Sequence, residues 1–159
     1  MWQRFGIGYD SHTFGAKRPL VLAGVTVEHT SGLEGHSDAD AVAHAVMDAL
    51  LGAAAMGDIG RLFPDTDERW KNADSLKLLA EVRRRLIAAS YTLVNVDVTV
   101  ITEEPKLAPH VDAMRNKLAG VLGLSFNQVS VKAKTNEGMD SVGKGKGLQV
   151  FAVASIGGA

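Results

Sequence analysis

Cysteine is absent from the 159 residues of this chain. Its absence excludes disulfide bonds and thiolate metal ligands, and it is compatible with a reducing compartment. An excess of charge of one sign is also absent, because 17 lysines and arginines stand against 18 acidic residues. A chain without a basic excess is not expected to bind nucleic acid as its main partner.

Long apolar runs are missing as well. The longest apolar stretch, residues 39–56, is interrupted by Asp40, His44 and Asp48, so no segment reaches the ~18 residues that a membrane span needs. The first residues lack the apolar core of a signal peptide. We therefore expect a soluble cytoplasmic protein with no membrane partner. The length suits a single domain over residues 1–159.

Apolar periodicity predicts a mixture of strands and helices. Strands are expected at residues 5–9, 20–23, 25–27, 96–100, 129–133 and 148–156. Capping residues and helical spacing predict helices from Asp38 or Asp40 to about Ala55, from Asp74 to about Ser90, and from Pro109 to about Leu122. Residues 60–72 are expected to form a loop. The pattern favours an α+β fold, a mixed β-sheet with helices packed on one face, as in a ferredoxin-like sandwich.

Two histidines and one aspartate predict a metal site. Asp10 and His12 are two residues apart on an expected strand, so their side chains leave the same face. His44 projects from the first long helix and could close the site. Two imidazoles and one carboxylate, with an open fourth position, are typical of catalytic zinc. The sequence therefore predicts Zn²⁺, or another divalent transition metal, at these three residues.

The same helix carries two more carboxylates. Asp40, His44 and Asp48 are spaced by four residues and share one face. Either carboxylate could orient the imidazole of His44 as a metal ligand, with Asp48 the preferred candidate. The alternative interpretation of His44 is a core histidine held by one of these aspartates, and that of Asp48 is a polar pocket wall.

Six stretches together resemble one enzyme family, the 2-C-methyl-D-erythritol 2,4-cyclodiphosphate synthases of non-mevalonate isoprenoid biosynthesis. They follow one another in the family's order along the whole chain. The stretches are Gly6–His12, Gly35–Asp40, Asp48–Ala54, Gly57–Asp67, Pro105–His110 and Lys132–Glu137.

The resemblance implies a lyase acting on 4-diphosphocytidyl-2-C-methyl-D-erythritol 2-phosphate. The 2-phosphate of this substrate attacks the β-phosphate, CMP leaves, and a cyclic diphosphate remains. The family implies a homotrimer that assembles through the sheets, with active sites between subunits. It also implies Zn²⁺ on Asp10, His12 and His44, and Mg²⁺ or Mn²⁺ on Glu137. His36 and Thr135 match the residues credited with stabilising the transition state.

The resemblance further implies a set of substrate contacts. On one side of the site, these are Asp10, Ser11, His12, His36, Ser37, Asp58, Ile59, Gly60, Phe63, Pro64, Asp65, Thr66 and Asp67. The cytosine and phosphate pocket of the adjacent subunit would use Thr102, Glu103, Glu104, Pro105, Lys106, Leu107, Ala108, Lys134 and Thr135. Asn136, Glu137 and Lys144 complete the implied substrate contacts.

Two positions depart from the family pattern. Lys144 stands where many members carry arginine, and it lacks the bidentate fork of a guanidinium. Phe151 stands where some members have a glutamate lining the central trimer channel. These departures remove the basis for expecting an isoprenoid diphosphate in that channel.

Two other function classes fit the predicted metal site. A zinc-dependent nucleotide phosphohydrolase would use the same metal to activate water, and it would release open-chain phosphates. A non-catalytic zinc-stabilised trimer or nucleotide sensor would bind cytidine nucleotides without turnover. An open zinc position and a separate Glu137 favour catalysis.

Overall fold

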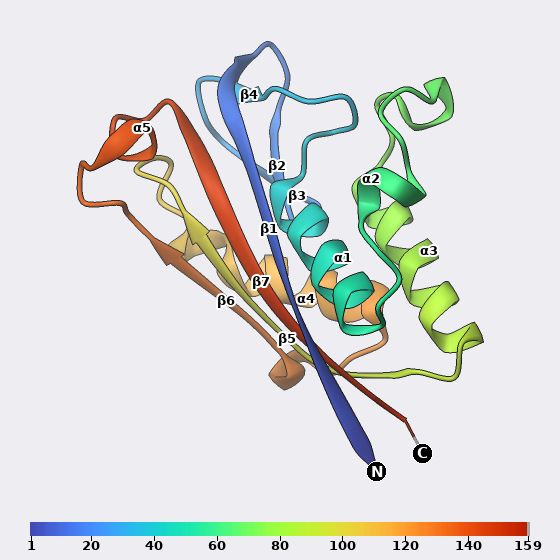
Figure 1. Ribbon diagram of the computed structural model, residues 1–159. Coiled ribbons are helices and arrows are strands. Elements are labelled where there is room, and N and C mark those ends of the chain that lie inside the picture. The colour runs from blue at the N-terminus through green and yellow to red at the C-terminus, as the bar shows by residue number, and fades with distance from the viewer. Residues whose placement is uncertain (159) are drawn as a thin grey trace.

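Two long strands from opposite ends of the chain form the centre of the sheet (Figure 1) in the computed structural model, which describes residues 1–158. β1 (Trp2–Ala16) pairs antiparallel with β7 (Gly147–Gly158) from Trp2 opposite Gly158 to Thr13 opposite Gly147. Both strands are longer than the sequence predicts, because glycines and polar residues hide the alternation at their ends.

The sheet has five strands in the order β4-β1-β7-β5-β6. β5 (Thr92–Ile101) and β6 (Val129–Lys134) are parallel, whereas β7 is antiparallel to both of its neighbours. β4 (Gly32–Leu33) extends the edge beside β1. The predicted mixed sheet is therefore confirmed. Separately, the two short strands predicted on either side of Gly24 are β2 (Leu20–Leu22) and β3 (Val25–Val27), which pair as an antiparallel hairpin.

The ferredoxin-like connectivity is wrong. A ferredoxin-like chain runs β-α-β-β-α-β. Here long helices separate β1 from β5 and β5 from β6, and only a one-turn helix lies between β6 and β7. The long link from β5 to β6 is a parallel crossover through a helix, which a parallel pair requires. Periodicity identifies strands but not their pairing, so the sequence predicts the layers correctly and the order of connections incorrectly.

Three long helices cover one face of the sheet (Figure 1), as predicted: α1 (Ala41–Ala53), α3 (Ser75–Ala88) and α4 (Val111–Leu122). The side chain of Asp40 caps α1 by accepting from the Ala43 N–H, and that of Asp74 caps α3. Gly123 ends α4 with a left-handed φ of 67°. α1 lies between the β1–β7 pair and α3, whereas α4 packs directly on β6. Most residues of α1 are therefore buried in one hydrophobic core.

Several one-turn helices occupy segments where the sequence predicts loops or no element, and one overlaps the predicted helix start at Pro109. The expected loop at 60–72 holds α2 (Ile59–Leu62) and the 3₁₀ turn η1 (Glu68–Trp70). The others are η2 (Ala108–His110), η3 (Phe126–Gln128) and α5 (Asp140–Gly143). Such elements are too short for apolar periodicity to reveal.

The opposite face of the sheet is uncovered and apolar. Phe5, Ile7 and Tyr9 of β1 are 67%, 69% and 47% exposed, and they lie beside the exposed Phe151 and Val153 of β7. The Tyr9 and Phe151 rings have centroids 5.1 Å apart. An apolar patch of this kind is typical of an interaction surface. Among the described residues, no helix is long and apolar enough to span a membrane.

Two glycines let α1 approach β1 at backbone distance. A Cβ built on Gly8 would lie 1.8 Å from the carbonyl oxygen of Ala45, and one on Gly6 would lie 2.0 Å from that of Ala49. No flexible side chain intervenes, so the helix must move if either glycine gains a methyl group.

We predict that Gly6→Ala lowers the free energy of unfolding by about 3 kcal/mol, because the extra methyl overpacks a contact between two backbones. Gly120→Ala is the matched control. Nothing lies within 4 Å of a Cβ at that exposed position in α4, so this change should stabilise the protein by about 0.5–1 kcal/mol. Urea unfolding followed by circular dichroism measures both, and equal stabilities for the two variants would contradict the close packing of α1 on β1.

Candidate metal and substrate site

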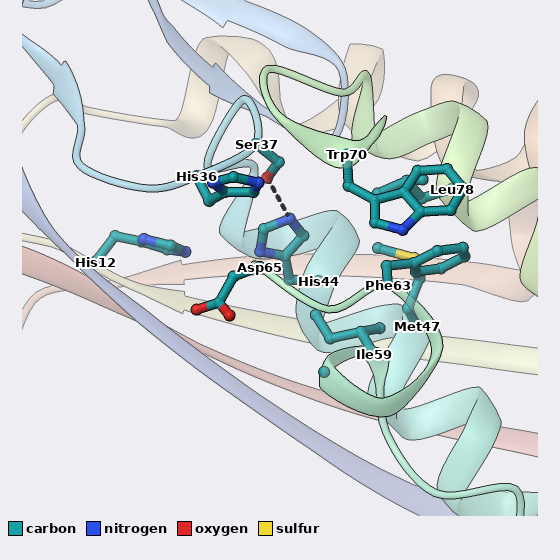
Figure 2. A pocket seen from close by; sticks show the side chains of 11 residues that line it. His12, His36, Ser37, His44, Met47, Ile59, Phe63, Asp65, Trp70 and Leu78 are labelled. Carbon is teal, nitrogen blue, oxygen red and sulfur yellow. Dashed lines mark hydrogen bonds between the residues drawn. The ribbon is translucent and has the colours of Figure 1, made fainter. Parts of the chain in front are cut away.

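A cavity of about 330 Å³ opens beside the N-terminal turn of α1 (Figure 2). One end is polar and the other is apolar, where Met47, Phe63, Trp70 and Leu78 gather. The predicted site residues lining it are His12, His36, Ser37, His44, Ile59, Gly60, Phe63 and Asp65. The structure therefore unites residues from β1, the 34–40 loop, α1 and the segment around α2.

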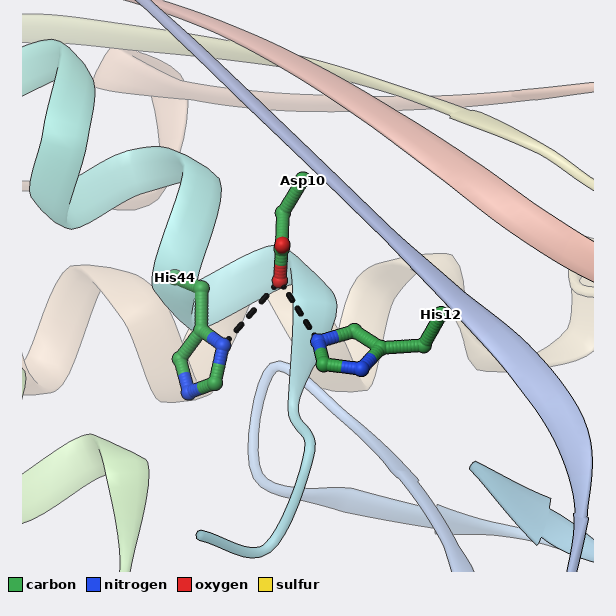
Figure 3. A group of neighbouring side chains, drawn as sticks. All are labelled: Asp10, His12 and His44. Atoms are coloured by element: carbon green, nitrogen blue, oxygen red, sulfur yellow. Dashed lines mark hydrogen bonds and ion pairs between the residues drawn. The ribbon is translucent and has the colours of Figure 1, made fainter. Parts of the chain in front are cut away.

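The three predicted metal ligands meet at this polar end (Figure 3). Oδ2 of Asp10 lies 2.8 Å from Nε2 of His12 and 3.0 Å from Nδ1 of His44. Asp10 and His12 leave the same face of β1, and His44 comes from the first turn of α1. All three side chains are partly buried.

The second ring nitrogen of His12 has a fixed partner. Nδ1 lies 2.6 Å from the carbonyl oxygen of Glu34. A carbonyl can only accept, so Nδ1 carries a proton, and in the neutral ring the lone pair lies on Nε2, the nitrogen that faces Asp10. This arrangement, a backbone carbonyl behind a histidine, is the usual support of a metal-binding imidazole.

The charges of the cluster reinforce one another. Burial disfavours ionised Asp10, but hydrogen bonds from His12 and His44 and their charges outweigh it and lower the pKa of Asp10 to about 2. Burial likewise disfavours protonated His12, but the Asp10 carboxylate raises the pKa of that imidazole above its ordinary value. Without an ion, the rings are thus held together by the carboxylate between them.

The donor set fits a divalent metal ion. One ligand atom from each of Asp10, His12 and His44 lies within 4.8 Å of the other two. Two imidazole nitrogens and one carboxylate oxygen suit zinc or a related transition metal, and leave a coordination position for a further group. The three residues predicted from the sequence as metal ligands could therefore hold such an ion.

The structure corrects the predicted supports of His44. The carboxylate of Asp40 accepts hydrogen bonds from the backbone N–H groups of Ala23, Gly24 and Ala43, and none of its hydrogen bonds goes to His44. Burial raises the pKa of Asp40 to about 6, although these three donors oppose the shift. Helical spacing placed Asp40 on the same face as His44, but Asp40 is the cap, and its side chain turns to the β2–β3 hairpin.

Asp48 also has another hydrogen-bond partner. Its Oδ1 accepts from the backbone N–H of Ile59 at 2.8 Å, which ties α2 to α1. Burial raises the pKa of Asp48, and nearby Asp58 and Asp10 add to the effect. Asp48 therefore makes no hydrogen bond to His44, and it is not among the residues that line the cavity.

His36 brings an unused polar atom to the cavity. Its Nε2 is buried and makes no hydrogen bond within residues 1–158. A buried nitrogen without a partner is costly in a folded protein unless a ligand supplies one. The position is thus suited to a bound molecule.

The second group of predicted contacts lines a smaller cavity of about 150 Å³ at the ends of β5 and β6. It is formed by Thr102, Pro105, Lys106, Leu107, Ala108, Ala133, Lys134 and Thr135. Glu103 has a supporting position instead, because its Oε1 accepts from the N–H groups of Asn136 and Gly138. His36 and Thr135, the two predicted catalytic residues, thus line different cavities of the chain.

Comparison with known proteins identifies the relatives of this arrangement. The YgbB family matches residues 3–157. The 2-C-methyl-D-erythritol 2,4-cyclodiphosphate synthase of Laribacter hongkongensis is 56% identical over 96% of this chain and 94% of its own. That of Synechococcus elongatus is 52% identical over 96% of both. The chain belongs to this family. The sequence-based prediction of a cyclodiphosphate synthase, a lyase, is thereby confirmed over the phosphohydrolase alternative.

Solved structures agree with this assignment. A 2-C-methyl-D-erythritol 2,4-cyclodiphosphate synthase in its CDP-bound form superposes with a TM-score of 0.89 at 37% identity, over 97% of this chain and 100% of that one. The bifunctional IspDF of Campylobacter jejuni superposes with a TM-score of 0.94 at 41% identity over 98% of this chain. The match covers only 42% of that longer protein.

The remaining predicted residues are not among those that line these two cavities. Ser11 is exposed and leaves the opposite face of β1 from Asp10 and His12. Glu137 is exposed and outside the three-residue cluster, with its Oε1 3.3 Å from the Thr135 hydroxyl. Others lie in turns and caps: Asp58 caps α2, Pro64, Thr66 and Asp67 follow it, Glu104 precedes Pro105, and Lys144 ends α5.

Arg18 holds residues 33–37 in place, a role that the sequence does not predict. The guanidinium of Arg18 donates to the carbonyl oxygens of Leu33, Gly35 and Ser37 at 2.6–3.1 Å. These contacts hold the segment that carries His36 and the Glu34 carbonyl. Contacts to backbone carbonyls leave no residue pattern, so nothing in the sequence singles out Arg18.

We predict a pH-dependent contribution of the Asp10–His12 pair to the stability of the metal-free protein. Folding lowers the pKa of Asp10 from 3.8 and raises that of His12 from 6.5. The pair therefore stabilises fully between these values, and its contribution is lost as pH falls toward 2 or rises through the folded pKa of His12.

Asp10→Asn removes this contribution. Urea unfolding of chelator-treated protein should show a larger stability difference between the natural chain and the variant near pH 5.5 than near pH 8. A difference that stays constant, or grows toward pH 8, would contradict the pairing. Taking the difference cancels shifted groups that Asp10 does not influence, such as Asp40.

Proposed function

We propose that this protein converts 4-diphosphocytidyl-2-C-methyl-D-erythritol 2-phosphate to 2-C-methyl-D-erythritol 2,4-cyclodiphosphate and CMP, for isoprenoid precursor biosynthesis. The observation that carries the proposal is the Asp10–His12–His44 cluster at the polar end of a cavity, beside the unpartnered Nε2 of His36, in a member of this family. No protein nucleophile is needed, because the substrate carries its own phosphate.

In this proposal, Asp10, His12 and His44 hold a divalent transition metal, with Zn²⁺ the best match to the donor set. A bound Zn²⁺ supplies Lewis-acid stabilisation of charge on phosphate oxygens. His36 donates from Nε2 to an oxygen of the same diphosphate, which satisfies its otherwise unpartnered nitrogen. Phosphoryl transfer depends mainly on such positioning and charge stabilisation.

Ring closure also requires the flexible substrate to be folded and water to be excluded. Holding reacting groups in place can lower a barrier by about 7–11 kcal/mol. The rings of Phe63 and Trp70 form an apolar wall, with centroids 5.1 Å apart. We propose that this wall and the Phe63–Asp67 segment cover the methylerythritol part and keep water from the anhydride.

The second half of the proposed site comes from a neighbouring chain. We propose a homotrimer that buries the apolar face of the sheet, around Phe5, Ile7 and Tyr9, and places the Thr102–Thr135 cavity of one subunit beside the His36 cavity of the next. The smaller cavity would take the cytidine. Glu137, which is exposed beside Thr135, would hold Mg²⁺ or Mn²⁺, since such ions prefer carboxylate and phosphate oxygens.

We predict equal amounts of CMP and cyclic diphosphate when the protein is incubated with the substrate, Zn²⁺ and Mg²⁺, and no product after chelation. His44→Ala should lose turnover and retain the fold. His29→Ala is the control, because His29 packs against Phe14 with the two rings tilted, outside both cavities. Product mass spectrometry decides: CMP with open-chain phosphates would identify hydrolysis instead, and CMP binding without turnover would identify a non-catalytic member.

We predict that Ile7→Lys dissociates the trimer and abolishes activity without unfolding the subunit, because the charge would lie on the buried interface. Ile87→Lys changes an equally apolar residue that is 51% exposed on α3, and should leave the assembly intact. Analytical ultracentrifugation measures both. A natural chain that sediments as a monomer would refute the shared site.

A further inference from the structure

A hydrogen-bond chain reaches His44 from the side opposite Asp10. Nε2 of His44 lies 2.9 Å from the hydroxyl oxygen of Ser75, the first residue of α3. The Ser75 hydroxyl donates in turn to Oδ1 of Asp38. The same Asp38 carboxylate accepts the Ser75 backbone N–H through Oδ2 at 3.0 Å. Ser75 is fully buried.

The direction of this chain follows from its donors and acceptors. A hydroxyl has one proton, and Ser75 gives it to a carboxylate, which can only accept. Toward His44, the Ser75 oxygen can therefore only accept, so Nε2 of the ring must carry the proton. In the neutral ring, the lone pair then lies on Nδ1, the nitrogen that faces Asp10 at 3.0 Å.

Asp38 is itself held in place by the backbone. Its Oδ1 accepts from the Asp40 N–H at 3.1 Å, and its own N–H donates to the Ala73 carbonyl at 3.2 Å. The carboxylate thus binds the start of α3 at two points, and the Ser75 hydroxyl cannot turn its proton toward His44 without abandoning a charged acceptor.

One other hydroxyl contacts the same nitrogen. Ser37 Oγ lies 3.1 Å from Nε2 of His44, and it accepts weakly from the Ala39 N–H at 3.3 Å. No carboxylate fixes the proton of Ser37 among its hydrogen bonds in the described chain. It can adapt to either tautomer of His44, so only Ser75 imposes a choice.

We propose that Ser75, held by Asp38, is a positioning residue that fixes the tautomer and orientation of His44 so that Nδ1 is presented for metal binding. His12 has the corresponding support in the Glu34 carbonyl, which in the neutral ring leaves the lone pair on Nε2. The two rings thus present different nitrogens to one point, each fixed from behind. The inference rests on the metal centre of the proposed function.

Ser75→Ala should weaken Zn²⁺ binding about tenfold to a hundredfold, the usual effect of losing a partner behind a metal-binding histidine. Asp74→Ala is the matched control. It removes the cap of the same helix, a hydrogen bond to the Leu76 N–H, without touching His44, and should bind Zn²⁺ within about twofold of the natural chain. Competition with a chromophoric chelator measures all three affinities in the full-length protein.

Nitrogen-15 NMR of the Zn²⁺-loaded protein gives a readout that mere loss of stability would not alter. The natural chain should show the His44 proton on Nε2, protected from solvent exchange, and Ser75→Ala should exchange it faster. If the Ser75→Ala chain does not fold, the spectrum of the natural chain decides, because a proton on Nδ1 overturns the inference.

The outcomes separate the two proposals. If the natural chain and Ser75→Ala bind Zn²⁺ equally well, the positioning role is overturned and the metal centre stands. If the natural chain does not bind Zn²⁺ at all, the metal centre fails, and the positioning role fails with it. Weak binding in both Ser75→Ala and Asp74→Ala would assign the effect to the helix and overturn the specific role of Ser75.

Discussion

The contact between the backbones of α1 and β1 is the constraint on which the site depends. Gly6 and Gly8 let the helix lie directly on the strand, where any side chain would separate them. Because of this approach, His44 in the first turn of α1 reaches a carboxylate on β1. Side chains elsewhere in the core could be exchanged for others of similar volume, but the distance between α1 and β1 is set by main-chain atoms.

Each metal-binding histidine has a hydrogen-bond partner that holds its ring in place. A carbonyl supports His12, a buried hydroxyl supports His44, and the guanidinium of Arg18 fixes the loop that supplies that carbonyl. Each of these supports comes from a different segment, so the order of the site is a property of the whole fold. Such preorganisation reduces the reorganisation needed when a highly charged substrate binds.

The sequence predicts best what local geometry determines. The spacing of Asp10 and His12 on a strand, and of His44 on a capped helix, was enough to place three ligands together. Asp40 shows the limit, because helical spacing ignores that a cap residue directs its side chain away from the helix face. Pairing of β5 with β6, and the hydrogen bonds of Arg18 and Ser75, depend on segments distant in sequence, and single residues give no sign of them.

The antiparallel pairing of β1 with β7 brings Trp2 opposite Gly158, so both ends of the described chain leave the sheet together (Figure 1). His12 lies ten residues farther along β1, which at 3.3 Å per residue is about 33 Å away. A domain attached at either terminus would lie at the end of the β1–β7 pair far from the metal ligands, and it would leave their cavity open. The architecture is thus suited to gene fusion, and the bifunctional relative from Campylobacter jejuni, of which this fold occupies 42%, is built in a way that this geometry permits.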